Sequence, residues 1–391
     1  MEFYKLALGW TTTAVVFVLM ISVLVAAHEY GHYLVGRIFR MNIEEFAIGF
    51  GPRIWTWRVN HYRVPLTPDQ QLAGLSDQVE THFNLRAIPL GGFVRVLGMQ
   101  PSEDRSELTV PGGFFTRSAS QRFLMLLAGP VFSILAGILM FFASLVIWGQ
   151  MVPDMTGPVV IGNISPNSPA SAAGLKPNDH ITTIDGAKIA SFKDLQTAVQ
   201  QKGLHPLTLT FDRAGKPWRV SITPAMLEGS PKLGISVAAS GKFHVEAVNG
   251  WDAAALSVSM PWLMIDDLAT MGQRHEKVTD NLGGPVRMVS ETHDAVTSGP
   301  AQTVQLAAML SISVGFFNLL PLSILDGGQM ALCLMEMIRR RPIPFKLQIA
   351  FLSYGFIILL TMVFGILFLD VKRLVTPAPT NPAVAAQAPS K

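Results

Sequence analysis

The sequence predicts a polytopic α-helical membrane protein with four transmembrane helices, a membrane-associated β-hairpin region after the first helix and a soluble domain inserted after the second. The composition supports this fold class, since 49% of the 391 residues are hydrophobic and 15% are charged, with a mean hydropathy of +0.37. Four apolar stretches are long enough to span a bilayer as helices. Between them, glycine-rich turns separate alternating apolar patterns that are typical of strands.

The predicted spans cover about 6–33, 122–148, 301–338 and 348–369. The third contains Asn318, Pro321 and Asp326 within apolar sequence, so we expect two helical pieces around irregular backbone, which a membrane tolerates where protein or a cavity surrounds it. The complete division is 1–33, 34–120, 121–150, 155–240, 241–300, 301–338, 347–370 and a disordered tail at 375–391.

The basic residues predict the orientation of the spans. They gather in the first and third loops, which lie on one side of a four-span protein, and the positive-inside rule places that side in the cytoplasm. The inserted domain then lies on the opposite, extracytoplasmic side. The residues concerned are Arg37, Arg40, Arg117 and Arg122 in the first loop, and Arg339, Arg340, Arg341 and Lys346 in the third.

His28-Glu29-Tyr30-Gly31-His32 is the main candidate for chemistry. On a helix His28 and His32 share a face and can bind one metal ion, while Glu29 can hold a water molecule without ligating. This pattern also occurs by chance, but ionisable groups inside a membrane span are costly and indicate a functional site. We therefore predict a zinc hydrolase with Zn²⁺ as cofactor.

A catalytic zinc site needs a third protein ligand. Asp326 is the best candidate because a lone carboxylate in an apolar segment needs a partner, although a helix-capping role is the alternative. Asp266 and Asp267 are weaker candidates on a predicted surface helix, and Glu336 is expected to pair with the basic loop that follows it. Asn318 is predicted to hydrogen-bond the oxyanion or the substrate backbone, or else to join helices.

Residues 34–120 predict hairpins, from aromatic and β-branched runs at 46–59 and 87–96 with a polar, mobile loop at 66–80 between them. The sheet either covers the helix ends or offers a strand edge that holds an unwound substrate. In the second case the substrate-binding residues include Gly49, Gly51, Gly91 and Gly92.

Residues 155–240 contain strand-like, helical and turn patterns in the order of a PDZ domain of the permuted kind found in bacterial proteases. The segment resembles this domain through Ser168-Pro169-Ala170, Ala173-Gly174-Leu175 and Ile184-Asp185-Gly186, although Asn178 stands where glycine is usual. Leu233, Gly234 and Ile235 are candidates for the loop that binds peptide C-termini, or for an ordinary closing strand. Residues 241–300 predict an amphipathic helix at the membrane surface, with a core helix as the alternative.

Together these motifs resemble the site-2 protease family of intramembrane zinc metalloproteases, most closely its bacterial regulator-of-sigma-E branch. The matching pieces are His28 to His32, Phe46 to Pro52, Pro89 to Val94, Gln121-Arg122, Ala128-Gly129-Pro130, the PDZ segment, Gly284-Pro285 and Asn318 to Gly328.

The resemblance implies zinc bound by His28, His32 and Asp326, with Glu29 as catalytic base. It implies substrates that are single-span membrane proteins already trimmed outside, of the anti-sigma-factor type, or remnant signal peptides. Two departures concern the single PDZ segment, where the branch often has two, and Ser133, where the family usually has asparagine. For Ser133 we expect a change in packing rather than lost activity.

Other functions fit less well. The net charge of +3 is too small to argue for nucleic acid, and one cysteine excludes an intramolecular disulfide. A PDZ membrane adaptor with a structural metal site would not need Glu29. A metal transporter would need further ligands in the spans.

Overall fold

The structure, a computed structural model, describes residues 2–100, 106–153, 159–165, 168–227, 230–237, 243–271 and 285–375. The predicted tail from 376 and the Gly283-Gly284 break lie outside these residues. The chain divides into two compact units. The first consists of Met1–Ile147 together with Asn249–Lys391, and the second consists of Trp148–Val248.

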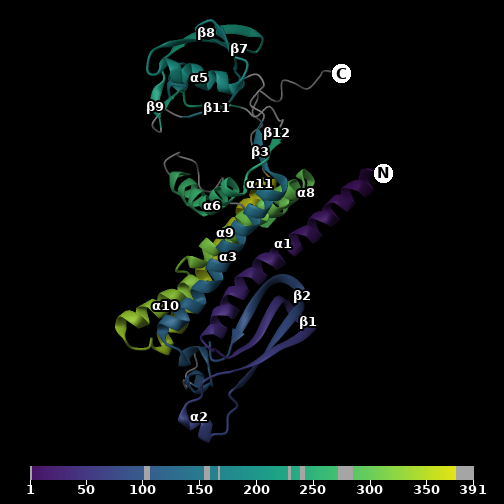
Figure 1. The fold of residues 1–391 in the computed structure, drawn as a ribbon, viewed down its shortest axis with the longest axis vertical. Coiled ribbons are helices and arrows are strands. Elements are labelled where there is room, and N and C mark those ends of the chain that lie inside the picture. Colours follow the sequence, from purple (N-terminus) through teal and green to yellow (C-terminus); the bar gives the residue numbers. More distant parts are fainter. Residues whose placement is uncertain are drawn as a thin grey trace. The chain divides into compact units, whose positions relative to one another are not determined.

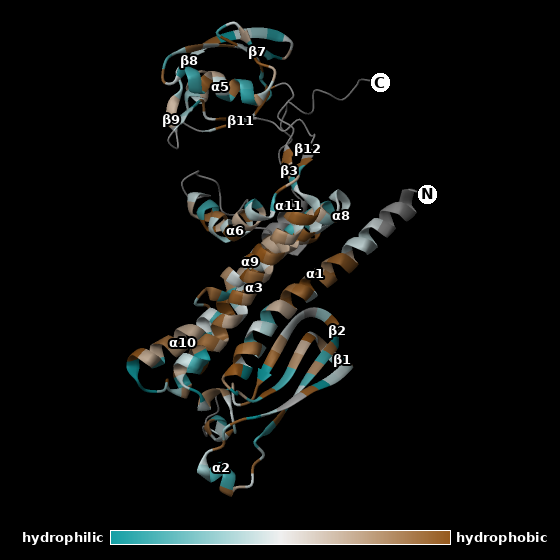
Figure 2. Cartoon of the chain, in the orientation of Figure 1, coloured by the Kyte–Doolittle hydropathy of each residue, from teal (hydrophilic) through white to brown (hydrophobic). Residues whose placement is uncertain are grey.

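Among the described residues, four helices of the first unit are long and apolar enough to cross a membrane: α1 (Glu2–Ile38), α3 (Ala119–Trp148), α9 (Pro300–Leu319) and α11 (Phe345–Val375). Figure 1 shows α1, α3 and α9 running alongside one another, and Figure 2 shows that apolar residues predominate along these helices. The helix α1 continues five residues beyond the predicted end at 33. It stops where Arg40 adopts a left-handed conformation (φ 53°) and the Met41 N–H donates back to the Gly36 carbonyl.

The predicted interruption of the third segment is present. The helix α9 ends at Leu319, residues 320–325 are not helical, and α10 covers Asp326–Arg339. Leu320 is extended because the following Pro321 disfavours the helical conformation there. A side chain at Gly327 would overlap the Leu320 carbonyl, so only glycine permits this tight re-entry into a helix.

A sheet built from β1 (Ile43–Arg63) and β2 (Gln78–Val96) packs against α1. Both strands bend at glycines with positive φ, and Glu45 lies opposite both Arg95 and His82. Residues 43–50 are therefore central. Residues 88–96, which pair with them on one side, form an edge among the described residues.

The edge segment lies beside α1. The Ser22 hydroxyl donates to the Pro89 carbonyl at 3.3 Å, and the Tyr33 ring packs edge-on against Phe46 and Phe83. The prediction of a mobile loop at 66–80 is wrong in part, since α2 (Pro68–Leu72) forms there. Its N-cap is a reciprocal pair between Thr67 and Gln70, which supplies the backbone partners that a short helix needs.

In the region 241–300 the described residues of the first unit form two helices, where the sequence predicted one. They are α6 (Gly250–Met271) and α8 (Pro285–Ser298), and α8 packs against α1, α9 and α11. Along α6, Ala253 and Ser257 are buried whereas Trp251 and Trp262 are exposed. No described residue covers these two rings, and the placement of the helix at the membrane surface stays a prediction. Two short 3₁₀ turns, Ser106–Thr109 and Phe114–Thr116, precede α3.

The second unit is a sheet in the order β11-β4-β5-β7-β8 with β6 paired to β5. Its strands are β4 (Val159–Ile164), β5 (His180–Ile184), β6 (Ala187–Lys188), β7 (Leu207–Arg213), β8 (Lys216–Ile222) and β11 (Ile235–Val237). The helices α4 (Pro169–Ala172) and α5 (Phe192–Lys202) complete it, and Leu195 and Val199 on α5 belong to its apolar core. Two small two-stranded pairings join β3 (Gln150–Pro153) to β12 (Phe243–Glu246) and β9 (Ala225–Leu227) to β10 (Ser230–Lys232).

These elements agree with the strands and helices predicted for 155–240. Asn178 has a φ of 70°, a left-handed conformation that asparagine tolerates better than most residues. This explains why it can replace the usual glycine.

Candidate metal centre

The helix α1 brings His28 and His32 together. They lie one turn apart, both are buried, and their Nε2 atoms are 3.2 Å apart. The helical spacing that the sequence predicted is therefore realised. Two imidazole nitrogens converge on one point.

The facing helix α3 holds the other nitrogen of each ring. His32 Nδ1 lies 2.9 Å from the Met125 carbonyl oxygen, and His28 Nδ1 lies 2.9 Å from Ser133 Oγ. A carbonyl oxygen only accepts, so the Nδ1 of His32 must carry the proton, and its Nε2 keeps a free lone pair. An outer partner of this kind fixes the ring orientation of a metal-ligating histidine.

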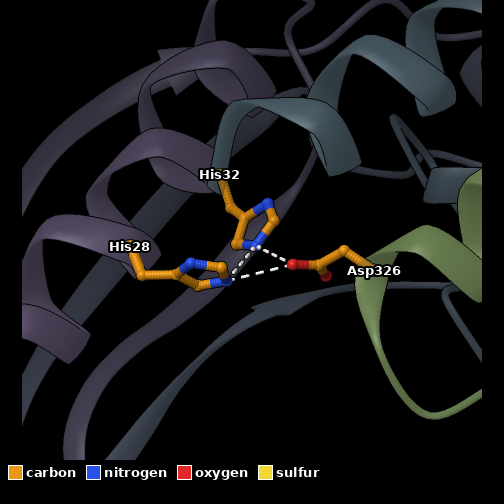
Figure 3. Close-up of side chains that lie close together, drawn as sticks. All are labelled: His28, His32 and Asp326. Atoms are coloured by element: carbon orange, nitrogen blue, oxygen red, sulfur yellow. Dashed lines mark hydrogen bonds and ion pairs between the residues drawn. The ribbon is translucent and has the colours of Figure 1, made fainter. Parts of the chain in front are cut away.

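Asp326, the first residue of α10, supplies the third group. Its Oδ2 lies 3.0 Å from His28 Nε2 and 3.3 Å from His32 Nε2, and Figure 3 shows the three side chains pointing toward one another. Ligand atoms of the three residues all lie within 4.8 Å of one another. Among the described residues, this is the cluster of three or more potential protein ligands that could hold a metal ion.

The donor set and the space around it fit zinc. Two imidazoles and a carboxylate are ligands that catalytic zinc uses, with a position left open for water. Gly129 on α3 contributes the space, because a Cβ built there would overlap His32 Nε2 and lie 2.8 Å from His28 Nε2. Gly31 on α1 lets the helices approach, since a Cβ there would overlap the Ala128 carbonyl.

A cavity of about 250 Å³ opens on the cluster. Glu29 and Asn318 line it together with the three candidate ligands, and so do Phe93 and Val94 from the edge segment of the sheet. The Asn318 amide donates to the Val314 carbonyl at 3.0 Å, which leaves its second N–H and its oxygen for another partner. The predicted base and the predicted amide therefore share the cavity with the ligands.

The other predicted substrate-binding residues lie in different places. A Cβ built on Gly92 would lie 2.7 Å from Val25 Cγ1 of α1, so this glycine lets the edge segment lie close to α1. Gly49, Gly51 and Gly91 form bends of the sheet and do not line the cavity. In the second unit, Leu233, Gly234 and Ile235 line a pocket of about 560 Å³ beside α5.

One expectation for a single residue is corrected. Glu336 pairs with Arg122 of α3 at 2.7 Å instead of with the basic loop after it, because α10 packs against α3. The Ser133 hydroxyl contacts His28 across the two helices, and the expectation that activity is kept stays a prediction. The weaker ligand candidates Asp266 and Asp267 are exposed on α6 and do not belong to the cluster.

Sequence reasoning missed the roles of Met125 and Gly129. The small residues at 128–129 indicated close helix packing, and a glycine next to a proline carries no sign of a metal site. Met125 acts through its backbone carbonyl, which no side-chain pattern can reveal.

The chain is similar to known proteins over most of its length. The model of peptidase family M50 matches residues 16–68 and 63–362. A protein of Agrobacterium fabrum is 30% identical over 94% of this chain and 98% of its own length. A protein of Rickettsia conorii is 29% identical over 92% of this chain and 98% of its own length. A protein of Clostridium perfringens is 28% identical over 90% of this chain and 96% of its own length. All three are named as candidate zinc metalloproteases.

Among solved structures, the PDZ domain of an SdrC-like protein from Listeria monocytogenes is 24% identical, with a TM-score of 0.19 over 21% of this chain and 87% of that domain. A solution structure from Geobacillus thermodenitrificans is 25% identical, with a TM-score of 0.18 over 20% of this chain and 90% of that protein. From the family match and the length over which the relatives align, the chain belongs to peptidase family M50, the site-2 protease family.

Proposed function

We propose that this protein is an intramembrane zinc metalloprotease in which His28, His32 and Asp326 hold the metal and Glu29 is the general base. The observation that carries the proposal is the convergence of the two Nε2 atoms and the Asp326 carboxylate beside Glu29 in one cavity. Ionisable groups gathered at a membrane span are costly unless they serve a function. The names of the relatives support zinc as the metal.

When bound, zinc would polarise the scissile carbonyl and lower the pKa of a water molecule at the open position. Glu29 takes the proton of the attacking water and delivers it to the leaving amine. Asn318 donates its second N–H toward the oxygen on which negative charge develops. Met125 and Ser133 keep the imidazoles turned toward the cavity.

The substrate is a membrane span that has unwound locally, because helical hydrogen bonds hide peptide bonds from attack. The edge segment 88–96 pairs with a described strand on one side only, so an extended chain can add along its other side. Phe93, Val94 and Met99 line both the metal-site cavity and a groove of about 960 Å³ along this edge. An extended substrate added to the edge would reach the metal and continue along the groove.

The substrates that we propose are single-span membrane proteins already trimmed on the periplasmic side, of the anti-sigma-factor type, and remnant signal peptides. The basic loops support a cytoplasmic location for the end of α1 that carries the metal centre, in a multi-pass inner-membrane protein. The second unit, a PDZ domain in this proposal, binds peptide C-termini in the periplasm at the pocket beside α5.

The decisive experiment compares the purified protein in detergent with a Glu29→Gln variant, each incubated with a tagged single-span substrate that lacks its outer domain. We expect both proteins to hold about one zinc ion per chain and only the parent to cleave within the span. Cleavage by Glu29→Gln would overturn the assignment of the base. If both hold zinc and neither cleaves any of several spans, a PDZ adaptor with a structural metal site replaces the protease.

A further inference from the structure

Ser133 lies in the middle of α3 and has no exposed surface. Its hydroxyl is 2.9 Å from His28 Nδ1, across the contact between α3 and α1. A buried hydroxyl needs a hydrogen-bond partner, and here the partner is the side chain of a candidate metal ligand.

The two histidines are held by different chemistry. The Met125 carbonyl can only accept, so it fixes the proton of His32 on Nδ1 and leaves Nε2 ready for a metal. The Ser133 hydroxyl can accept or donate. His28 Nε2 can bind a metal only when the imidazole proton is on Nδ1. The Ser133 oxygen must then accept a hydrogen bond from Nδ1–H.

A contact from α9 holds Ser133 in place. The Ser311 hydroxyl donates to the Ser133 carbonyl oxygen at 2.8 Å, and Ser311 is fully buried. Ser133 on α3 therefore contacts α1 through its hydroxyl and α9 through its backbone carbonyl. Such a contact can set the orientation of a ring because neither partner is free to move away.

We propose that Ser133 is a positioning residue that holds His28 in the tautomer and orientation required for metal binding. It acts only through His28 and touches neither substrate nor the open position of the site. The inference rests on the proposed metal site and adds to it a residue that sets the affinity for the metal.

The test measures zinc retention in the full-length protein in detergent, by titrating zinc-loaded protein with a chelator. Ser133→Ala should lose zinc at roughly 10-fold lower chelator concentration than the parent, the lower end of what outer-partner mutations cost in metal affinity. Ser133→Thr keeps the hydroxyl and should retain zinc better than Ser133→Ala. Ser144→Ala is the matched control, because Ser144 is equally buried on α3 and its hydroxyl faces the Ala301 carbonyl instead.

The outcomes separate a positioning role from a structural one. Weaker zinc retention by Ser133→Ala, with a melting temperature of the metal-free protein close to that of Ser144→Ala and rescue by threonine, supports the proposal. Equal zinc retention by the parent and Ser133→Ala overturns it while leaving the metal site intact. If the parent itself holds no zinc, the proposed function fails first and this inference fails with it.

Discussion

Arg122 on α3 and Glu336 on α10 form an ion pair of 2.7 Å that ties together the two helices flanking the metal centre. Arg122 is buried, and its Nε also donates to the Arg117 carbonyl at 3.2 Å. Glu336 follows Asp326 by ten residues on one helix, while Arg122 precedes Met125 by three on the other. The pair therefore fixes the helix that carries Asp326, the proposed third ligand, against the helix whose Met125 carbonyl contacts His32.

Removing one partner of this pair should destabilise the protein strongly. Glu336→Leu leaves the Arg122 guanidinium buried without its counter-charge, and we expect a loss of about 3–5 kcal/mol. The double variant Arg122→Met with Glu336→Leu should recover much of that loss, because it leaves no buried charge. Unfolding in detergent measures both, and a double variant no more stable than Glu336→Leu would contradict this account.

Gly129→Ala should abolish zinc binding. The added Cβ would overlap His32 Nε2 and lie 2.8 Å from His28 Nε2, in the space where the two ligand atoms converge. The control is Gly365→Ala on α11, where a Cβ would meet nothing within 4 Å. Zinc content by elemental analysis distinguishes them, and full occupancy in Gly129→Ala would show that α3 can move aside.

Asp326→Asn should lower zinc occupancy, because a neutral amide is a poorer ligand than a carboxylate for a cation held by two neutral imidazoles. Asp266→Asn changes an exposed acid on α6 and should keep the zinc content of the parent. Equal zinc contents in the two variants would remove Asp326 from the ligand set.

The pocket beside α5 should bind peptides through a free C-terminal carboxylate. A fluorescent peptide that ends in an apolar residue should bind the full chain, and its C-terminally amidated form should not. Gln196→Trp would place a large ring at the pocket lining and should block binding. Thr197→Trp, exposed on the same helix outside the lining, is the control, and equal binding of free and amidated peptides would exclude this mode.

The stability of the second unit should fall in acid partly through Asp185. Lys202 Nζ donates to this carboxylate at 2.6 Å and the Thr208 N–H donates at 2.7 Å. Both hold the pKa of Asp185 below its ordinary value of 3.8. Because the folded-state pKa is lowered, the contribution is complete above the unfolded pKa of about 4 and is lost as the pH falls through the folded value.

Asp185→Asn removes this contribution at every pH. The drop in melting temperature between pH 5 and pH 2 should therefore be smaller in the variant than in the parent. An identical drop in both proteins would mean that Asp185 has the same pKa folded and unfolded.

Features that depend on near neighbours in sequence could be predicted well. The pairing of His28 with His32 follows from helical spacing alone, and the break before Asp326 follows from Pro321 and two glycines. Errors arose where a distant segment decided the outcome. Glu336 was expected to pair with charges a few residues away, whereas its partner Arg122 lies 214 residues earlier.

The sequence by itself determined the four apolar helices, the strands and the candidate base and ligands, because hydropathy, helical period and ionisable groups in apolar sequence are local properties. Only the tertiary structure decided how the site is assembled. Asp326 meets His28 across 298 residues, and Met125 and Ser133 contact the rings of His32 and His28 from 93 and 105 residues away. Such contacts form only when helices pack. The physical reason is that these groups are common in any helix and matter only through their neighbours. The Met125 carbonyl, the Ser133 hydroxyl and the space at Gly129 bear on the site because helix packing places the two histidines against them.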